Sequence, residues 1–307
     1  MKQIRIFCYG GVDFSPYLKF LPGIADNYEI INDNYNPQIA FYRQEYLHIL
    51  PKRFDCTHVI LCKEYQIPDM TQCNYAFQYD YTDDPCRFRF PYYSWFNFEN
   101  DLVKPQNYDP EQVLRSKTKF CAFVYSRPHP YRNHFFDILS QYKHVDAPGF
   151  QRNNMPPIGD ATTLRDARYI PANLLFEKLR NFLKDYKFVI AFENRIANGY
   201  VTEKICNPML VNSIPIYLGN PLIERDFNTK SFVHVLDFFE DRNSIQNTVQ
   251  VHNKEFNEAT KYIMELDNND QMYCDMLAQP WYNNNIVNEY ADKNNIATFF
   301  MKIFDSL

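Results

Sequence analysis

A short polar segment between two apolar runs carries the side chains best suited to chemistry. The run Phe188–Phe192 predicts a buried strand, and Thr202 stands where a helix N-cap belongs, followed by Glu203 and Lys204. Unpaired N–H groups at the helix start, with the ammonium of Lys204, could hold a diphosphate. The Glu203 carboxylate could accept hydrogen bonds from two neighbouring ribose hydroxyls. The residues alone leave an alternative open, in which Glu203 only complements the helix dipole and Lys204 is solvated.

The elements that must position these residues alternate between strand and helix in the second half of the chain. The predicted strands are Phe120–Ser126, Phe188–Phe192, Ile214–Leu218 and Phe232–Leu236. The predicted helices are Arg132–Tyr142, Leu174–Tyr186, Thr202–Val211, Glu255–Leu266, Gln271–Leu277 and Ile296–Phe304. This alternation is typical of a doubly wound α/β domain, whose ligands bind beyond the carboxyl ends of the strands. We therefore expect chemistry in the loops after Ser126, Phe192 and Leu218.

The first half of the chain also contains runs that predict strands, but its alternation of strands and helices is less clear than that of the second half. Its predicted strands are Ile4–Tyr9, Pro37–Tyr42 and Thr57–Cys62. Residues 80–110 are rich in Asp, Pro, Tyr and Asn without a clear period, which predicts irregular structure and a boundary near Ser116. The sequence thus predicts an α/β protein with two Rossmann-like domains facing a central cleft. These domains are residues 1–116 and 117–285, with a helical tail over 286–307.

The composition of the chain limits the kinds of molecule that it is expected to bind. The 307 residues carry a net charge of −5, without the basic excess of proteins that follow a phosphate backbone, so no nucleic-acid partner is expected. A small anionic ligand needs only two or three local cations and stays open. The eight cysteines include no CxxC pair and no Cys/His cluster with zinc-ligand spacing. Scattered cysteines of this kind favour free thiols in a reducing compartment.

No targeting or metal signal stands out. No stretch approaches the roughly 18 apolar residues of a membrane span, and Met1–Gly11 is interpreted as a first strand rather than a signal peptide. We expect a cytoplasmic protein, and peripheral association with the inner face of a membrane stays open. Asp80, Asp83 and Asp84 are interpreted as turn residues, so no metal site and no cofactor is predicted.

The order of residues from Phe192 to Gly219 resembles the donor-binding motif of the family 10 fucosyltransferases. The matching letters are F-E-N, then Y-V-T-E-K, then I-P-I-Y-x-G. The resemblance continues through Phe120–Ser126 with Arg132, His144–Gly149, Asp226–Phe238 and, upstream, Glu64–Pro68, Asn74–Phe77 and Phe90–Tyr93. It covers about two-thirds of the chain and is more specific in the second half.

The resemblance implies a GT-B fold and an inverting transfer of fucose from GDP-fucose. The acceptor would be a GlcNAc- or Glc-containing glycan such as N-acetyllactosamine, lactose or a bacterial surface polysaccharide. The product would contain an α-1,3 or α-1,4 linkage. Inversion in one displacement needs a base on the acceptor hydroxyl, on the face opposite the departing phosphate. Glu64 matches the base proposed for the family.

The same resemblance implies donor-binding roles for five residues. Arg132 and Lys204 match the cations that face the diphosphate, where preorganised charge stabilises the departing GDP. Asn194 and Tyr200 match residues that line the donor pocket. Glu203 matches the carboxylate that holds the ribose. GDP-fucose is therefore implied as a substrate, with no metal strictly required.

Several features depart from the family pattern. Arg195 replaces a usual Ser, Arg127 replaces a usual Asn, and Pro208 falls inside a helix that it should kink. The stretch 240–254 has no counterpart, and Glu193 could be purely structural. Two alternatives therefore stay open, which are the same fold with another GDP-sugar, or a non-catalytic module that binds glycans or nucleotides.

Overall fold

The computed structural model describes residues 1–10, 13–46, 54–62, 65–158, 172–242 and 252–307. Contacts divide the chain into two units. Unit 1 comprises residues 1–99, 198–200 and 287–307, and unit 2 comprises residues 100–197 and 201–286. The predicted boundary near Ser116 differs from this division because helix α3 (Pro110–Ser116) packs against α9 (Asp270–Ala278) of unit 2. The expected tail over 286–307 likewise joins unit 1 rather than standing alone.

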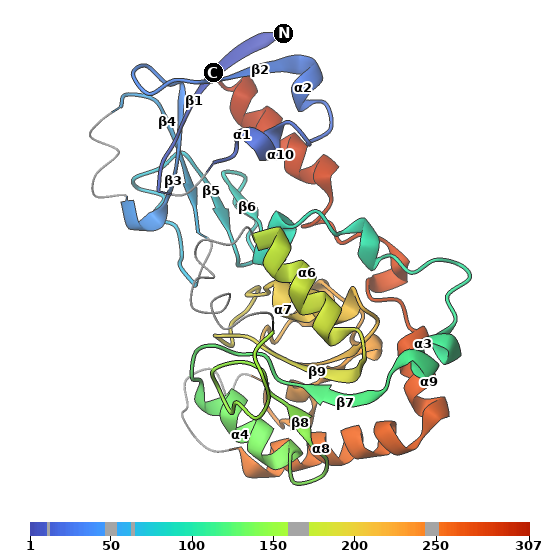
Figure 1. The fold of residues 1–307 in the computed structure, drawn as a ribbon. Helices are drawn as coiled ribbons and strands as arrows, with labels where there is room; N and C mark the ends of the chain where they lie inside the picture. Colours follow the sequence, from blue (N-terminus) through green and yellow to red (C-terminus); the bar gives the residue numbers. More distant parts are fainter. Residues whose placement is uncertain (11–12, 47–53, 63–64, 159–171, 243–251) are drawn as a thin grey trace. The chain divides into compact units, whose positions relative to one another are not determined.

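Unit 1 is built on a parallel sheet of six described strands in the order β2-β1-β3-β4-β5-β6 (Figure 1). The strands are β1 (Lys2–Cys8), β2 (Tyr28–Asn32), β3 (Ile39–Arg43), β4 (Thr57–Leu61), β5 (Tyr75–Gln78) and β6 (Arg87–Arg89). Its described helices are α1 (Ser15–Leu18), α2 (Ile24–Asn27) and α10 (Lys293–Asp305). The sequence did not predict β2 and β5, and β6 lies in a stretch that was expected to be irregular.

The C-terminal helix α10 completes the core of unit 1. Phe300 is fully buried and packs near the rings of Phe14, Phe41 and Phe77. At the end of the helix, the Tyr28 hydroxyl donates a 2.6 Å hydrogen bond to an Asp305 carboxylate oxygen. Burial of this apolar face explains why the last residues belong to the first sheet.

Unit 2 is a second parallel sheet, with five described strands in the order β11-β10-β9-β7-β8. The strands are β7 (Lys119–Ala122), β8 (Val145–Asp146), β9 (Tyr186–Phe192), β10 (Ile214–Leu218) and β11 (Val233–His234). Besides α3 and α9, its described helices are α4 (Pro130–Leu139), α6 (Ala172–Leu183), α7 (Glu203–Met209) and α8 (Asn253–Asn268). Both units are thus parallel α/β domains, as the sequence predicted.

Several predicted elements of unit 2 differ in length from the observed ones. The strand expected over Phe120–Ser126 ends at Ala122, and the one expected over Phe232–Leu236 gives way to a 3-10 helix at Val235. The helix expected to reach Tyr186 ends at Leu183, because Tyr186 already begins β9. Apolar runs predict that a segment is buried, but they do not fix where its backbone pairing ends.

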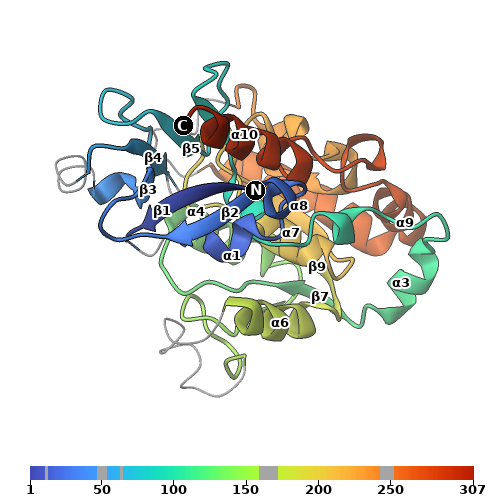
Figure 2. The same cartoon turned by 90° about the horizontal axis from the view of Figure 1, so that it is seen from above.

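Strand β9 shows why the unit 2 sheet is covered on both faces. The rings of Phe188 and Phe192 meet aromatic residues of α9, α4 and α8, whereas Val189 belongs to a buried cluster with Leu179 and Leu183 of α6. Side chains alternate between faces along a strand, so a strand with helices on both sides is apolar throughout. Figures 1 and 2 show α6 and α8 on opposite sides of β7 and β9.

The segment between β9 and α7 passes briefly into unit 1. Gly199 has a φ of +75°, and a Cβ there would come within 2.6 Å of the Tyr79 carbonyl oxygen. The buried Arg89 guanidinium donates hydrogen bonds to the carbonyls of Tyr79 and Gly199. Glycine is therefore required at this position by both its backbone angle and its close contact.

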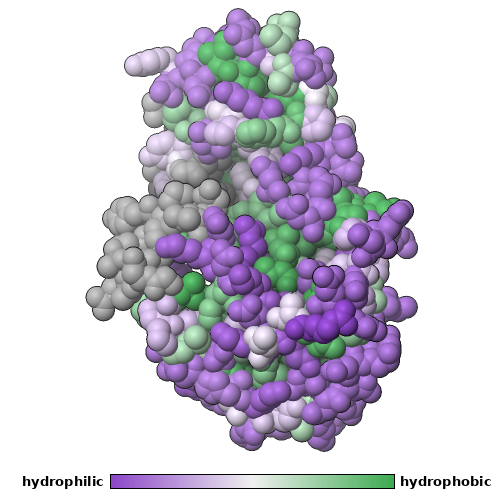
Figure 3. All heavy atoms as spheres, turned by 45° about the vertical axis from the view of Figure 1, so that its right-hand side comes forward, coloured by the Kyte–Doolittle hydropathy of each residue, from purple (hydrophilic) through white to green (hydrophobic). Residues whose placement is uncertain are grey.

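The surface is dominated by polar residues. On the face shown in Figure 3, hydrophilic side chains cover most of the area and hydrophobic ones gather in smaller patches. Across the described residues, no helix combines the length and the apolar character needed to cross a bilayer. All eight cysteine thiols are free.

Candidate functional site

The junction between β9 and α7 is held by a buried carboxylate. Glu193 is 3% exposed, and both the backbone N–H and the hydroxyl of Thr202 donate 2.7 Å hydrogen bonds to it. The Thr202 hydroxyl oxygen in turn accepts from the backbone N–H of Lys204, which confirms the predicted N-cap. Glu193 therefore fastens the start of α7 to the end of β9. Its role is to position Glu203 and Lys204.

Lys204 is a cation held among two carboxylates. Its Nζ lies 3.4 Å from Glu203 Oε1, 3.7 Å from Glu193 Oε2 and 3.1 Å from the Thr202 hydroxyl oxygen. Burial lowers the pKa of Lys204, but the carboxylates of Glu203 and Glu193 outweigh that effect, and the net pKa is raised. The ammonium group is thus kept charged. Because α7 has only seven residues, this charge matters more for anion binding than the dipole of the helix.

Arg132 is the second cation of the site and is rigidly held. It is 3% exposed, its Nε and Nη2 donate to the Phe192 carbonyl at 3.1 and 2.9 Å, and Nη2 also donates to the Asn194 side chain. The guanidinium carbon lies 4.2 Å from the centre of the Tyr125 ring. Arg132 Nη1 has no hydrogen-bond partner among the described residues. The guanidinium group of Arg132 is therefore held in place, and its Nη1 is left to bind another group.

Tyr125 packs against the guanidinium of Arg132 and was missed at the sequence level. Its hydroxyl donates to the carbonyls of Ile190 and Phe192 and accepts from the Phe192 N–H. Burial raises the pKa of Tyr125, against the opposing charges of Arg132 and Lys204. The only sequence signal was an aromatic residue near the end of a predicted strand, and such residues are mostly core.

Four of the six predicted site residues meet at one edge of the unit 2 sheet. Arg132 contacts Asn194, and Lys204 contacts Glu203. The two pairs also act on one another, since the charge of Arg132 lowers the pKa of Lys204. This edge carries the carboxyl ends of the strands, where ligands of parallel α/β sheets bind.

The other two predicted site residues are not placed at this edge. Tyr200 is 2% exposed and belongs to unit 1, where its ring meets Tyr79 and Tyr65 edge-on. Its expected role in donor binding stays a prediction. Glu64 lies outside the described residues, so its role as a base also stays a prediction.

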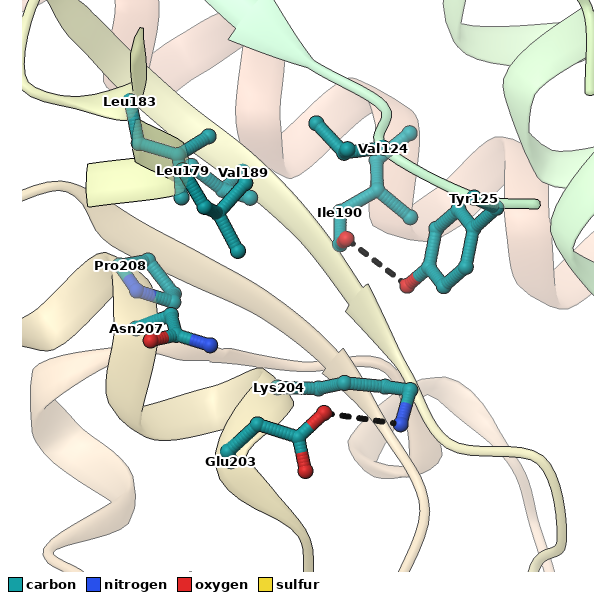
Figure 4. A pocket seen from close by; sticks show the side chains of 10 residues that line it. All are labelled: Val124, Tyr125, Leu179, Leu183, Val189, Ile190, Glu203, Lys204, Asn207 and Pro208. Carbon is teal, nitrogen blue, oxygen red and sulfur yellow. Dashed lines mark hydrogen bonds and ion pairs between the residues drawn. The ribbon is translucent and has the colours of Figure 1, made fainter. Parts of the chain in front are cut away.

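A pocket opens beside Glu203 and Lys204 and extends between α6 and α7 (Figure 4). Its volume is about 110 Å³. The lining is Val124, Tyr125, Leu179, Leu183, Val189, Ile190, Glu203, Lys204, Asn207 and Pro208. Pro208, which was expected to kink its helix, comes one residue before the end of α7 and serves as part of the pocket wall. Asn207 was not predicted to belong to the site.

His129, at the N-cap of α4, is a further residue that the sequence did not single out. Burial lowers the pKa of His129, the charges of Arg132 and Arg195 lower it further, and a hydrogen bond to the Asn194 backbone opposes them. The ring is thus kept neutral beside the two arginines.

Of the three aspartates that were interpreted as turn residues, Asp84 begins a turn. The backbone N–H of Arg87 donates to the Asp84 carbonyl, and that of Cys86 donates to the Asp84 carboxylate. Asp84 also forms an ion pair of 3.0 Å with Arg87. In the part of the chain that the structure describes, no group of three His, Cys, Asp or Glu residues is arranged to hold a metal.

The two parallel α/β units have the architecture of a GT-B glycosyltransferase. Solved structures of an α1,3-fucosyltransferase, with GDP and with GDP-fucose, superpose with a TM-score of 0.72 in each case. Both cover 99% of this chain and 91% of the solved chain, at 24% and 23% identity. At such identities the likeness establishes the fold.

The chain belongs to glycosyltransferase family 10 (fucosyltransferase). The model of the C-terminal part of that family matches residues 114–301, which is more than half of the chain. A putative fucosyltransferase of Acanthamoeba polyphaga mimivirus is 27% identical over 85% of this chain, and an α-(1,3)-fucosyltransferase of Helicobacter pylori is 36% identical over 52%. A GDP-fucose protein O-fucosyltransferase 3 of Xenopus tropicalis is 26% identical over 54%. The matched parts span 39%, 27% and 31% of these relatives, so the chain covers well under half of their lengths.

Proposed function

We propose that this chain transfers L-fucose from GDP-fucose to a hydroxyl of an acceptor, with inversion at the transferred carbon. The observation that carries the proposal is the pair of cations, Arg132 and Lys204, beside the Glu203 carboxylate at the ligand-binding edge of a family 10 chain. A nucleoside diphosphate needs cations for its phosphates and an acceptor for its ribose hydroxyls.

Arg132 and Lys204 would stabilise GDP as it departs. The bond between the sugar carbon and the phosphate oxygen breaks, and the electron pair leaves on the diphosphate. Cations that are already fixed stabilise that charge without reorganisation. Arg132 meets this condition because the Phe192 carbonyl, Asn194 and the Tyr125 ring hold its guanidinium in place.

Glu64 is the residue that we propose as the base. In an inverting displacement, the acceptor oxygen loses its proton to the base while it attacks from the face opposite the diphosphate. The proposal for Glu64 rests on its match to the family pattern. The acceptor that we propose is a GlcNAc- or Glc-containing glycan, with an α-1,3 or α-1,4 linkage, and the relatives that are protein O-fucosyltransferases add a peptide as a second acceptor class.

Release of GDP by the purified chain tests the donor and the acceptor together. We expect release from GDP-fucose with lactose or N-acetyllactosamine, and little from GDP-mannose. Release from GDP-mannose alone would favour another GDP-sugar as the donor, and release with a peptide alone would change the acceptor class. Tight GDP binding without release from any pair would indicate a non-catalytic binding module.

Substitution of Glu64 separates chemistry from binding. Glu64→Gln should lower turnover by about 100-fold or more, as loss of a general base does, while GDP affinity stays unchanged. Glu29→Gln, on strand β2 of unit 1, is a matched control that should keep wild-type turnover. Wild-type turnover in Glu64→Gln would remove this residue from the mechanism.

A further inference from the structure

A hollow between α3 and α9 of unit 2 lies apart from the residues that the proposed transfer uses. Figures 1 and 2 both show these helices side by side, and they pack against each other. The volume of the hollow is about 220 Å³, against about 110 Å³ for the pocket beside Lys204, and the two linings share no residue. The residues that line the hollow are Glu111, Leu114, Arg115, Asp270, Gln271 and Cys274.

The most deeply buried residue of this lining is a cysteine whose thiol has no partner. Cys274 is 7% exposed, and no hydrogen bond to its thiol is found among the described residues. A thiol is a weak donor and a weak acceptor, and buried polar side chains usually find a partner within the fold. The Cys274 thiol instead lines a hollow that is open to solvent. A ligand in the hollow would therefore contact it.

Carboxylates surround the Cys274 thiol. Burial raises the pKa of this thiol, and the negative charges of four acidic side chains raise it further. These side chains are Glu111, Asp270, Asp275 and Asp109. Arg115 is the only cation among the residues that line the hollow, so three net negative charges remain around one thiol. A concave surface with charge of one sign concentrates ions of the opposite sign.

Asp270 is the lining carboxylate with the most freedom to bind a ligand. The Glu111 carboxylate lies 3.4 Å from an Arg115 nitrogen. The Asp270 carboxylate, in contrast, has no hydrogen bond or ion pair among the described residues. Asp270 lies in the first turn of α9, four residues before Cys274 and on the same face of the helix. A group bound by Asp270 therefore lies beside the thiol.

The lining disfavours the ligand classes that the rest of the molecule suggests. An anion such as a phosphate would be repelled by the carboxylates, and a sugar would find no aromatic ring among the lining residues. A metal ion would find no group of three His, Cys, Asp or Glu residues arranged to hold it in the part of the chain that the structure describes. An organic cation with a short apolar stem fits best, because the carboxylates match its charge and Leu114 and Cys274 match its stem.

We propose that this hollow binds an alkylammonium group, with Asp270 and Glu111 facing the charge and Leu114 and Cys274 along the stem. The proposal goes beyond the proposed fucose transfer, and neither depends on the other. Two sources carry the same group, which are a free diamine and a lysine side chain of another protein. Both would be held by the same contacts, so the experiments use one probe of each kind.

Charged thiol reagents test the electrostatics of the hollow in the full chain. The reagent 2-aminoethyl methanethiosulfonate carries an ammonium group, and 2-sulfonatoethyl methanethiosulfonate carries a sulfonate group. The Cys274 thiolate attacks the sulfur of either reagent, forms a mixed disulfide and releases methanesulfinate. At low salt, the ratio of the cationic to the anionic rate should exceed that of 2-mercaptoethanol by about 10-fold or more, and it should fall at high salt. Mass spectrometry of the peptide that contains Cys274 gives both rates.

Removal of the two lining carboxylates should abolish this preference. In Asp270→Asn combined with Glu111→Gln, the rate ratio should fall by about fivefold or more. The thermal unfolding midpoint should stay near that of wild type, because both side chains are exposed. Glu258→Gln is the matched control, since it removes an exposed carboxylate from α8, outside the lining, and it should keep the wild-type ratio. A wild-type ratio in the double variant would contradict the role of these carboxylates.

Protection of Cys274 distinguishes the two sources. At matched ionic strength, 1,4-diaminobutane should slow the reaction of Cys274 with the neutral reagent iodoacetamide, whereas 1,4-butanediol should not. Protection by N-acetyl-lysine methylamide as well would show that a single lysine side chain is enough, and protection by the diamine alone would identify the source as a free diamine. No protection by either amine, or a wild-type rate ratio equal to that of 2-mercaptoethanol, would overturn the proposal. GDP release is measured separately, so failure of the proposed function would leave this result unaffected.

Discussion

Lys104 and Lys204 are both withdrawn from water in unit 2, yet their pKa values shift in opposite directions. Lys104 donates to the carbonyls of Leu277 and Gln279 and lies 3.7 Å from the centre of the Trp281 ring. Burial lowers the pKa of Lys104 to about 7. Lys204 has two carboxylates beside it, and they raise its pKa despite burial.

The pKa of Lys117 is also lowered, but less than that of Lys104. Its Nζ donates to the carbonyls of Lys184 and Val211, and burial lowers its pKa to about 8, opposed by the single carboxylate of Asp185. The three lysines thus have none, one and two carboxylates that affect their titration. Among these three lysines, the pKa stays high only where the fold places carboxylates beside the buried ammonium group. One such place in unit 2 is the proposed diphosphate site, where Lys204 lies beside Glu203 and Glu193.

Substitutions of Lys204 and Lys104 should differ most in their effect on kcat/KM for GDP-fucose. Lys204→Met removes a cation from the departing diphosphate and should lower kcat/KM for GDP-fucose by about 100- to 1000-fold. Lys104→Met makes the same chemical change in the same unit and should leave kcat/KM near the wild-type value. Steady-state GDP release at one pH measures both. A similar loss in the two variants would show that the effect comes from the fold of unit 2.

Arg132 tests whether charge alone is enough at this site. Arg132→Lys keeps the charge but loses the planar fork that the Phe192 carbonyl and Asn194 hold. GDP affinity should fall by about 10-fold or more, the range for a hydrogen bond to a charged group. Arg115→Lys on the exposed face of α3 is the matched control. Wild-type GDP affinity in Arg132→Lys would leave Lys204 as the only cation that the donor needs.

The site was predictable where its signals are local. The apolar run that forms β10 was predicted with its observed bounds, and Thr202 was recognised as an N-cap from its place before Glu203. Capping and strand patterns depend on neighbours in sequence, so a single chain reveals them. The order of Asn194, Glu203 and Lys204 around these signals then carried the resemblance to the family.

What the sequence could not reveal depends on partners far along the chain. Lys104 meets Leu277 and Gln279, more than 170 residues away, and its lowered pKa has no local signal. Tyr125 looked like a core residue until Arg132 was placed on its ring. Asn207 lines the pocket between α6 and α7, and only a three-dimensional arrangement can show this.

Lys104 should also make the stability of unit 2 depend on pH. Its folded pKa of about 7 lies below the ordinary value of 10.5, so the unfolded chain binds more protons between these values. The stability contribution of this group therefore rises with pH over that range, by at most about 1.4 kcal/mol per pH unit. Relative to Lys104→Met, wild type should gain stability from pH 7 to 9.

Urea unfolding of a single-tryptophan protein measures this gain. Trp281 lies beside Lys104, and Trp95 is the only other tryptophan, so Trp95→Phe leaves a reporter for unit 2. The comparison must be the difference between wild type and Lys104→Met in this background, because buried cysteines and tyrosines titrate with the opposite sign. A difference that is constant from pH 7 to 9 would mean that Lys104 is charged throughout.

Lys117 gives the smallest effect and the sharpest test of the series. Its folded pKa of about 8 starts the proton difference one pH unit later than for Lys104, so Lys117→Met should match the pH dependence of wild type up to about pH 8 and fall behind above it. Relative to Lys204→Met, wild type should gain no stability below pH 10. The folded pKa of Lys204 is raised, so the stability contributed by this group is lost rather than gained as pH rises, and the loss begins only above pH 10.5. The pH at which each lysine begins to affect stability would then rise with the number of neighbouring carboxylates. A shared onset for Lys104 and Lys117 would show that burial alone sets these pKa values and that Asp185 contributes nothing.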